Sequence, residues 1–222
     1  ISKSKLKGIN YNMPISSAQV KSSILLAALG SDTETKITEK VTSRDHSEIM
    51  LKNIGVDITT DGRSIIVAPC NKFLPLDIHI PADPSTAAFF IGATVLMPGS
   101  KLRVMNMLLN ETRIGFINAL EKMGCSFNYY NVHKEAGEKI GDIEVTYHKL
   151  NGINIDASDI PSIIDELPML ALIASQARGI TKVSGAKELR VKESDRIKAI
   201  CKNLREIGGD IEEKSDGFII NG

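Results

Sequence analysis

The stretch RIKAICKNLREIGGDIEE, residues 196–213, carries the pattern that decides the fold. Its apolar side chains recur at helical spacing, while Lys and Glu occupy the opposite face of the predicted helix. The apolar stripe consists of Ile197, Ile200, Leu204 and Ile207. Gly208 follows at the position where glycine relieves the strain of a left-handed helix C-cap. The stretch therefore predicts an amphipathic helix with one packed face, followed by a short strand over 210–213.

The same pattern is written three times along the chain, and each copy has a glycine that ends its amphipathic helix: Gly55, Gly124 and Gly208. Every copy reads as a small-residue helix, a strand, the amphipathic helix and two closing strands. The predicted elements are 19–30, 35–38, 46–55, 56–59 and 64–67; then 85–96, 101–105, 113–123, 125–130 and 142–147; then 165–177, 180–183, 196–207, 210–213 and 217–220. Each copy is expected to be a βαβαββ unit of a mixed α/β fold (α+β type), in which a sheet covers a helix pair.

The small-residue helices are almost continuously apolar, as in ILLAAL at 24–29 and AAFFIGA at 87–93, which predicts burial on most sides. The polar stretch 131–141 is expected to form the tip of a hairpin. Pro81 and Pro84 interrupt regular hydrogen bonding between the first and second copies. We therefore expect one domain over 1–82 and another over 83–222.

Composition limits the possible functions. The chain has 222 residues, with 27 Lys and Arg against 27 Asp and Glu, so it has no net field to attract nucleic acid or an anionic membrane. No apolar run is long enough to span a bilayer or to act as a signal peptide. The three cysteines match no metal or redox pattern, which favours reduced thiols in a cytoplasmic protein, and they are expected to be core residues. The four histidines share no ligand spacing, so no metal site is predicted.

The entrance to the third amphipathic helix, ELRVKESDR at 188–196, is far more charged than the corresponding entrances of the other two copies. Capping together with a solvated charged run is one interpretation. The other interpretation is that these charged residues form a binding or catalytic site. Extending the helix back by one turn places Glu193 in line with Ile197, which predicts an inward carboxylate that is either paired with Arg196 or has a raised pKa. Lys192, at the helix N-terminus, would have a lowered pKa suited to proton transfer.

Two further helix entrances carry polar groups. The sequence ISSAQ at 15–19 places hydroxyls and an amide at a helix N-terminus, which fits either a phosphate or carboxylate site or an ordinary serine cap. In the third copy, Asp165 precedes the small-residue helix, and taken alone it is best explained as a cap.

Five motifs in this order resemble the 5-enolpyruvylshikimate-3-phosphate synthase family of enolpyruvyl transferases. They are SAQ at 17–19, SRDH at 43–46, DPSTAAFF at 83–90, IDELP at 164–168 and RVKESDR at 190–196. The resemblance implies a two-domain fold, an inside-out α/β barrel built of six such units, three in each domain. Because the chain lacks an initiator Met and begins within an apparent unit, we expect it to be the middle half of such a protein.

The resemblance implies transfer of the enolpyruvyl group of phosphoenolpyruvate to the 5-hydroxyl of shikimate 3-phosphate, with release of phosphate and without a redox cofactor. This reaction belongs to aromatic amino-acid biosynthesis. By similarity, the residues expected to bind shikimate 3-phosphate are Ser17, Ala18, Gln19, Ser43 and Arg44. Arg44 would meet the substrate phosphate, and Gln19 would also lie near the enolpyruvyl donor.

The same resemblance assigns the chemistry to the second domain. Asp165 would contact the attacking hydroxyl as proton acceptor, while Lys192 and Glu193 would manage protons at the hydroxyl and the methylene carbon. Arg196 would hold the carboxylate or phosphate of the donor. Two polyanions need Arg and Lys, and addition followed by elimination needs separate proton donors and acceptors.

Other parts of the family's active site have no counterpart in the chain: its first lysine-serine phosphate site, its glycine-rich donor loop and its late arginine segment. We therefore expect this chain alone not to turn over, and the full-length enzyme to be a monomer. Two alternatives are an enolpyruvyl transferase acting on UDP-N-acetylglucosamine, and a non-catalytic interaction module built from repeats whose site residues are only caps.

Overall fold

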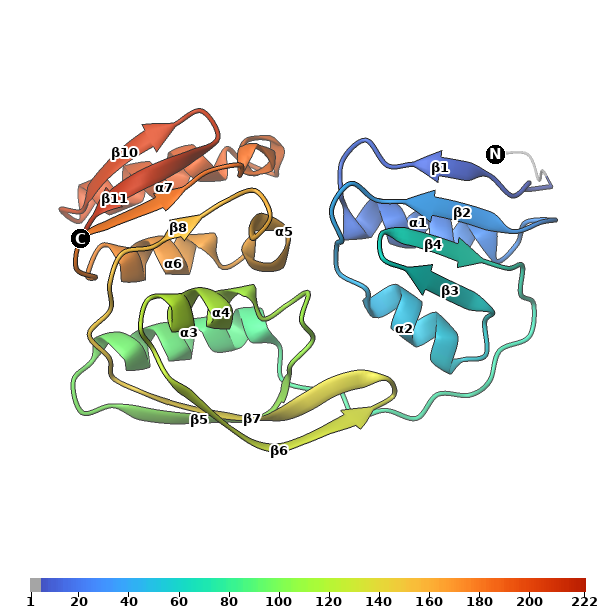
Figure 1. Cartoon of the computed structure of the whole chain (residues 1–222), viewed down its shortest axis with the longest axis horizontal. Coiled ribbons are helices and arrows are strands. Elements are labelled where there is room, and N and C mark those ends of the chain that lie inside the picture. The colour runs from blue at the N-terminus through green and yellow to red at the C-terminus, as the bar shows by residue number, and fades with distance from the viewer. Residues whose placement is uncertain (1–4) are drawn as a thin grey trace. The chain divides into compact units, whose positions relative to one another are not determined.

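The computed structural model describes residues 5–222 and places them in two compact units, each of which is described by itself (Figure 1). Unit 1 comprises the chain up to Ile80 together with Lys134–Glu138. Unit 2 comprises Pro81–His133 and Lys139–Gly222. The assignment of 1–82 and 83–222 to the two globular domains of a longer protein stays a prediction.

Unit 1 contains the first copy of the repeat, and its sheet has the strand order β1-β2-β4-β3. The elements are β1 (Asn10–Asn12), α1 (Ala18–Ala28), β2 (Thr35–Thr38), α2 (His46–Asn53), β3 (Ile58–Asp61) and β4 (Ser64–Val67). Only β1 and β2 pair in parallel; the other neighbours in this sheet are antiparallel. Leu25 of α1 and Leu51 of α2 belong to one buried cluster with Ile37 and Ile65 of the sheet, so both helices pack on the same face.

Unit 2 contains the second and third copies, with helices between two sheets (Figure 1). The second copy consists of α3 (Pro84–Leu96), β5 (Lys101–Leu108), α4 (Gly115–Lys122), β6 (Phe127–Glu135) and β7 (Glu138–Thr146). The third consists of β8 (Asn154–Ile155), α5 (Ile160–Ile163), α6 (Leu167–Ala174), β9 (Ile180–Val183), the 3-10 helix η1 (Lys187–Val191), α7 (Arg196–Glu206), β10 (Asp210–Lys214) and β11 (Gly217–Asn221). The sheets have the orders β5-β7-β6 and β10-β11-β9-β8.

Small residues on the first helix of a copy allow close packing inside unit 2. A Cβ atom on Gly92 of α3 would lie 2.7 Å from Sδ of Met169, which belongs to α6. The absence of a side chain at Gly92 therefore lets the two helices approach each other. Their buried residues form one continuous core with the inner faces of both sheets.

The predicted repeat is confirmed. The glycines that end the three amphipathic helices all have positive φ angles, 88° at Gly55, 101° at Gly124 and 90° at Gly208, which is the C-cap geometry that the sequence predicts. The βαβαββ order is complete in the first and third copies. In the second, the opening strand is reduced to a single parallel bridge between Ala82 and Met107.

Two predictions about individual elements are wrong. The first helices are not all buried on most sides: α6 is, but Leu26 of α1 is 61% exposed and Phe89 of α3 is 64% exposed. Continuous apolar sequence does not reveal which face of a helix has a neighbour. The polar stretch 131–141 does form the end of a hairpin, as predicted, but the predicted strand bounds 125–130 and 142–147 are wrong, because β6 continues to Glu135 and β7 begins at Glu138.

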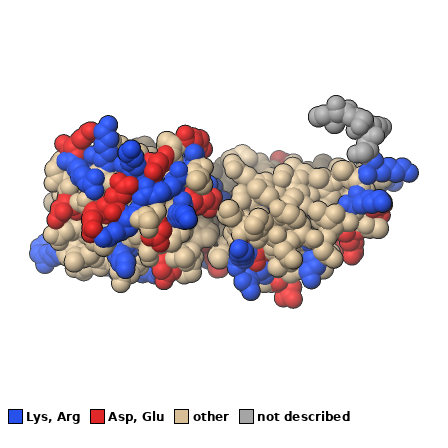
Figure 2. Space-filling view, turned by 90° about the horizontal axis from the view of Figure 1, so that it is seen from above, with Lys and Arg blue, Asp and Glu red and all other residues tan. Residues whose placement is uncertain are grey.

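Among the described residues, no helix is both long and apolar enough to cross a membrane. Cys125 and Cys201 are buried and Cys70 is half-buried, all as free thiols. Burial raises the pKa of Cys125 to about 11 and also raises that of Cys201. Figure 2 shows acidic and basic side chains interspersed over one face of unit 2, as expected for a chain with equal numbers of each.

Candidate active-site residues

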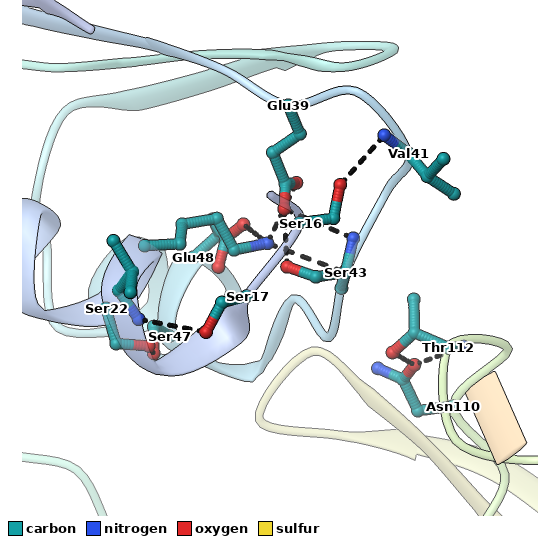
Figure 3. Close-up of polar contacts among 12 residues, drawn as sticks. Ser16, Ser17, Ser22, Glu39, Val41, Ser43, Ser47, Glu48, Asn110 and Thr112 are labelled. Atoms are coloured by element: carbon teal, nitrogen blue, oxygen red, sulfur yellow. Dashed lines mark hydrogen bonds and ion pairs between the residues drawn. The ribbon is translucent and has the colours of Figure 1, made fainter. Parts of the chain in front are cut away.

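The N-terminus of α1 presents the first predicted site in unit 1 (Figure 3). Ser17 is the N-cap, and its hydroxyl accepts a hydrogen bond from Val20 N at 3.4 Å. The hydroxyl of Ser16 accepts from Val41 N at 2.9 Å, which joins the helix entrance to the loop after β2. Ser17 is thus an ordinary cap, as one interpretation of the sequence has it, while the backbone of Ala18 and the exposed Gln19 remain in the first turn of the helix.

A buried charged cluster lies one turn further along α1, and nothing in the sequence pattern signals it. Lys21 is fully buried, and its Nζ atom lies 3.1 Å from Oε2 of Glu39 and 2.6 Å from Oε1 of Glu48. Burial raises the pKa of Glu48, against the opposing effect of the hydrogen bond from Lys21. The other carboxylate oxygen of Glu48 is buried and has no hydrogen-bond partner among residues 5–222.

Ser43 is held within this cluster and is buried. Its hydroxyl and its backbone N–H both donate to Oε1 of Glu39, at 2.5 and 3.2 Å. Its carbonyl accepts from Nζ of Lys21 at 3.4 Å. The side chain of Ser43 is therefore committed to Glu39, whereas that of the adjacent Arg44 is only half-buried.

The predicted residues of unit 2 meet around Arg196, at the start of α7. Its guanidinium donates to Oδ1 of Asp165 at 3.2 Å and to Oε2 of Glu193 at 2.8 Å. Asp165 is thus not the cap of α6, where Glu166 takes the N-cap position. Three residues that the sequence places in two separate motifs form one contiguous cluster of charges.

The inward orientation predicted for Glu193 is wrong. Its side chain is 80% exposed, and a hydrogen bond to its carboxylate from its own backbone N–H lowers its pKa, with a further contribution from Arg196. The helix does not extend back to this residue, because Asp195 is the N-cap and its carboxylate accepts from Lys198 N at 3.0 Å. The prediction was wrong because it continued the helical periodicity of α7 past its N-cap, where the backbone is no longer helical and the side chain of Glu193 points elsewhere.

Lys192 likewise lies outside α7, just after η1, rather than in the first turn of a helix. Its ammonium pairs with Glu188 at 2.8 Å, and its side chain is 28% exposed. The proposed effect of a helix N-terminus on this lysine therefore has no basis in the fold. The ammonium is nevertheless held on the same short segment as Glu193.

Arg190 anchors this charged segment to the end of the neighbouring hairpin. Its Nη1 atom donates to Asp195 at 2.9 Å and to Glu213 at 2.8 Å, and its Nε atom donates to the carbonyl of Ser215 at 2.8 Å. Nη2 donates to the carbonyl of Lys214. Much of the unusual charge of this helix entrance therefore fixes the segment in place.

The segment that carries Asp165 is supported by a second polar chain. The carboxylate of the buried Glu166 accepts from the hydroxyl of Ser85, and Ser85 in turn accepts from Arg113 at 2.8 Å. Arg113 also pairs with Asp83 at 2.7 Å. These contacts join the entrances of α3, α4 and α6.

Sequence reasoning identified the charged residues near helix entrances but missed their supports: Lys21, Glu39, Glu48, Arg113 and the anchoring role of Arg190. Lys21 stands beside Gln19, Ser22 and Ser23 in the first half of α1, so no local signal in the sequence reveals its burial. Among the described residues, no group of three or more His, Cys, Asp or Glu side chains could hold a metal ion.

Comparison with known proteins places these features in a family. The profile of the EPSP synthase (3-phosphoshikimate 1-carboxyvinyltransferase) family matches residues 1–222. A protein named 3-phosphoshikimate 1-carboxyvinyltransferase from Sulfurihydrogenibium sp. is 46% identical over 98% of this chain, which covers 52% of that protein. One from Endomicrobium trichonymphae is 48% identical, with 98% and 50% covered. The chain thus spans about half the length of these curated relatives.

Solved structures show the same similarity. An EPSP synthase from Acinetobacter baumannii superposes with a TM-score of 0.88 and 41% identity, over 98% of this chain and 49% of that one. The enolpyruvyl transferase NikO from Streptomyces tendae superposes with a TM-score of 0.73 at 16% identity, over 100% of this chain and 52% of that one. The second likeness shows the shared fold alone.

Proposed function

The chain belongs to the EPSP synthase (3-phosphoshikimate 1-carboxyvinyltransferase) family, and on that premise we propose that it supplies part of an active site that transfers the enolpyruvyl group of phosphoenolpyruvate to the 5-hydroxyl of shikimate 3-phosphate, releasing phosphate. The observation that carries the proposal is the cluster of Asp165, Glu193 and Arg196. It brings a proton acceptor and an anion-binding group together in a chain that matches this family along its whole length.

Unit 1 is proposed to hold shikimate 3-phosphate. The backbone N–H groups of Ala18 and Gln19 lie in the first turn of α1, where the helix itself offers no acceptor, so they suit an anionic oxygen. The guanidinium of Arg44 suits a phosphate because it offers donors in a fixed fork. The hydroxyl of Ser17 already caps the helix. Ser43 would act chiefly by fixing Arg44, because its own hydroxyl is committed to Glu39.

Unit 2 is proposed to carry the proton transfers. In the addition step the 5-hydroxyl oxygen bonds to C2 of phosphoenolpyruvate, the hydroxyl proton leaves, and the methylene carbon gains a proton. In the elimination step the C2–phosphate bond breaks and the new methyl group loses a proton. Asp165 would accept the hydroxyl proton, and Glu193, with a lowered pKa, would be a carboxylate able to accept the proton lost in elimination.

The two basic residues complete this scheme. Lys192 would donate the proton to the methylene carbon, since its ammonium is a compact donor on a flexible stem. Arg196 would hold the carboxylate or phosphate of phosphoenolpyruvate with a charge-assisted pair of hydrogen bonds. Because Arg196 is bound to Asp165 and Glu193 in the described structure, donor binding would draw it partly away from them and leave both carboxylates available as bases.

Several broader properties form part of the same proposal. The assembled enzyme would be a cytoplasmic monomer that needs neither nucleic acid nor a redox cofactor, with 1–82 and 83–222 in its two globular domains. The 222-residue chain alone would not turn over, because the matched relatives are about twice as long.

A chimera tests the proposal directly. In it, this chain replaces the matched half of the Sulfurihydrogenibium relative, and phosphate release is measured with phosphoenolpyruvate and either shikimate 3-phosphate or UDP-N-acetylglucosamine. Activity with shikimate 3-phosphate alone is expected. Lys192→Met and Arg196→Met in the chimera should each lower kcat/KM by about 100-fold or more while the fold survives, on the scale of a lost charge-assisted transition-state contact. Little loss in either variant would instead support the non-catalytic repeat module.

A further inference from the structure

We propose that Lys21 and Glu39 are positioning residues whose buried ion pair sets the orientation of the peptide groups on both sides of Ser43, and so the direction in which Arg44 leaves the loop. The inference rests on the proposed function, in which Arg44 and the first turn of α1 hold one substrate. Neither Lys21 nor Glu39 would touch that substrate, since both side chains are essentially fully buried, at 0% and 1% exposure. Their effect would act through Ser43.

The peptide groups on both sides of Ser43 are held by this one pair. The N–H of Ser43 donates to Glu39 at 3.2 Å, and its carbonyl, which belongs to the peptide bond with Arg44, accepts from Lys21 at 3.4 Å. Glu39 also takes the hydroxyl of Ser43. With both backbone groups and the side chain bound, the chain direction at which Arg44 leaves the loop is fixed.

The same lysine joins this loop to α1. The backbone N–H of Lys21 donates to the carbonyl of Ser17 at 2.9 Å, in the first turn of the helix, while its ammonium reaches the carbonyl of Ser43 in the loop. A second link runs from Val41 N to the hydroxyl of Ser16. The two segments that are proposed to hold the substrate are therefore tied together through one buried ammonium group.

Burying an ammonium group with two carboxylates is a costly way to stabilise a fold, because desolvation offsets most of the attraction, and apolar residues of similar size often serve better. The two carboxylates are also unequal. The carboxylate of Glu39 accepts hydrogen bonds from both Lys21 and Ser43. One carboxylate oxygen of Glu48 contacts Lys21, and the other has no hydrogen-bond partner in the described part of the chain. A purely structural role would need only charge compensation, which either carboxylate could give.

This inequality provides a matched pair of variants in the 222-residue chain. In Glu48→Gln, the side-chain carbonyl can still accept a hydrogen bond from Lys21, and no hydrogen bond to Ser43 is removed. In Glu39→Gln the side chain cannot satisfy both neighbours. Its carbonyl should turn to the buried ammonium of Lys21, which would repel the NH2 group, and the NH2 group then faces the N–H of Ser43, which loses its acceptor. Glu39→Gln should therefore speed hydrogen exchange of the Ser43 amide by about tenfold, the factor for one lost hydrogen bond, relative to Glu48→Gln. Equal exchange rates at Ser43 in the two variants would overturn the proposal.

Glu39→Asp covers the case in which Glu39→Gln fails to fold. It keeps the charge opposite Lys21 but is one methylene too short to hold both neighbours, so exchange at Ser43 should again rise. If the Ser43 amide stays as protected in Glu39→Asp as in the unmodified chain, the positioning role is excluded.

The active chimera supplies a readout that a merely structural role would not move. Glu39→Gln should raise KM for shikimate 3-phosphate by about tenfold, with a smaller change in kcat. Glu48→Gln should leave KM unchanged, even if the two variants lose similar amounts of thermal stability. An equal KM in both variants would contradict the positioning role. A chimera that is inactive before any substitution would refute the proposed function and leave the exchange result in the isolated chain to stand by itself.

Discussion

Replacing Arg190 with methionine tests whether the charged entrance of α7 is held in place by its contacts with the β10–β11 hairpin. The substitution keeps most of the side chain's length but removes hydrogen bonds to two carbonyls and two carboxylates. Each is worth about 0.5–1.5 kcal/mol net, and the partners can rebind water because the arginine side chain is 22% exposed. We expect the free energy of unfolding of unit 2 to fall by about 2 kcal/mol.

Arg205→Met is the control for Arg190→Met. Arg205 lies in the last turn of α7 and, among the described residues, makes one comparable bond, from Nε to the carbonyl of Ile211 at 3.1 Å, so its loss should cost about 1 kcal/mol or less. In urea titrations followed by NMR signals of unit 2, Arg190→Met should shift the midpoint by about 1 M, for a slope of about 2 kcal/mol per M. Equal shifts in the two variants would refute the anchoring role of Arg190.

Three further predictions concern the cysteines, Glu48 and Gly208. In native protein at pH 8, Cys70 alone of the three cysteines should react fast with a thiol reagent, because burial raises the pKa of Cys125 to about 11 and also raises that of Cys201. Rapid labelling of all three cysteines before unfolding would contradict this. Because burial raises the pKa of Glu48, the folded chain binds the carboxyl proton more tightly than the unfolded chain, and the free energy of unfolding should fall as pH rises from 4.5 through the raised pKa. The Glu48→Gln variant has no carboxyl group to ionise, so its melting temperature should not show this decrease. An identical pH dependence of melting in the variant and the unmodified chain would contradict the prediction. Gly208→Ala should cost about 1 kcal/mol because its φ is 90°, whereas Gly30→Ala, at a position without positive φ and with ordinary contacts, should cost little in the same denaturation assay.

The architecture could be predicted from the sequence because the relevant signals are local. Apolar spacing and a terminal glycine define each amphipathic helix, and the three copies check one another. The burial of the first helices could not be predicted, since it depends on which faces meet neighbours: Leu26 and Phe89 are as apolar as the buried Leu25 but are exposed.

The candidate site could be predicted only in part. Charged residues at helix entrances stand out in the sequence, and the family motifs name them. Their orientations depend on where the helix starts, and a single N-cap, Asp195, reversed the prediction for Glu193. The supporting contacts between Lys21 and Glu39 and between Ser85 and Glu166 join residues 18 and 81 positions apart, and no local pattern connects them.

The second copy shows what a helix entrance needs when it carries no predicted site residue. There, the N–H and the hydroxyl of Thr112 both donate to the side-chain carbonyl of Asn110, at 2.8 and 2.6 Å, so uncharged side chains close the turn (Figure 3). Of the two charged side chains at this entrance, Glu111 and Arg113, the arginine turns to Asp83 and Ser85. Since Glu111 and Arg113 are the charged residues of an entrance without a predicted site residue, the more numerous charges of the third entrance, at residues 188–196, exceed what the scaffold requires. That excess is best explained by ligand binding and by the contacts that position the binding groups.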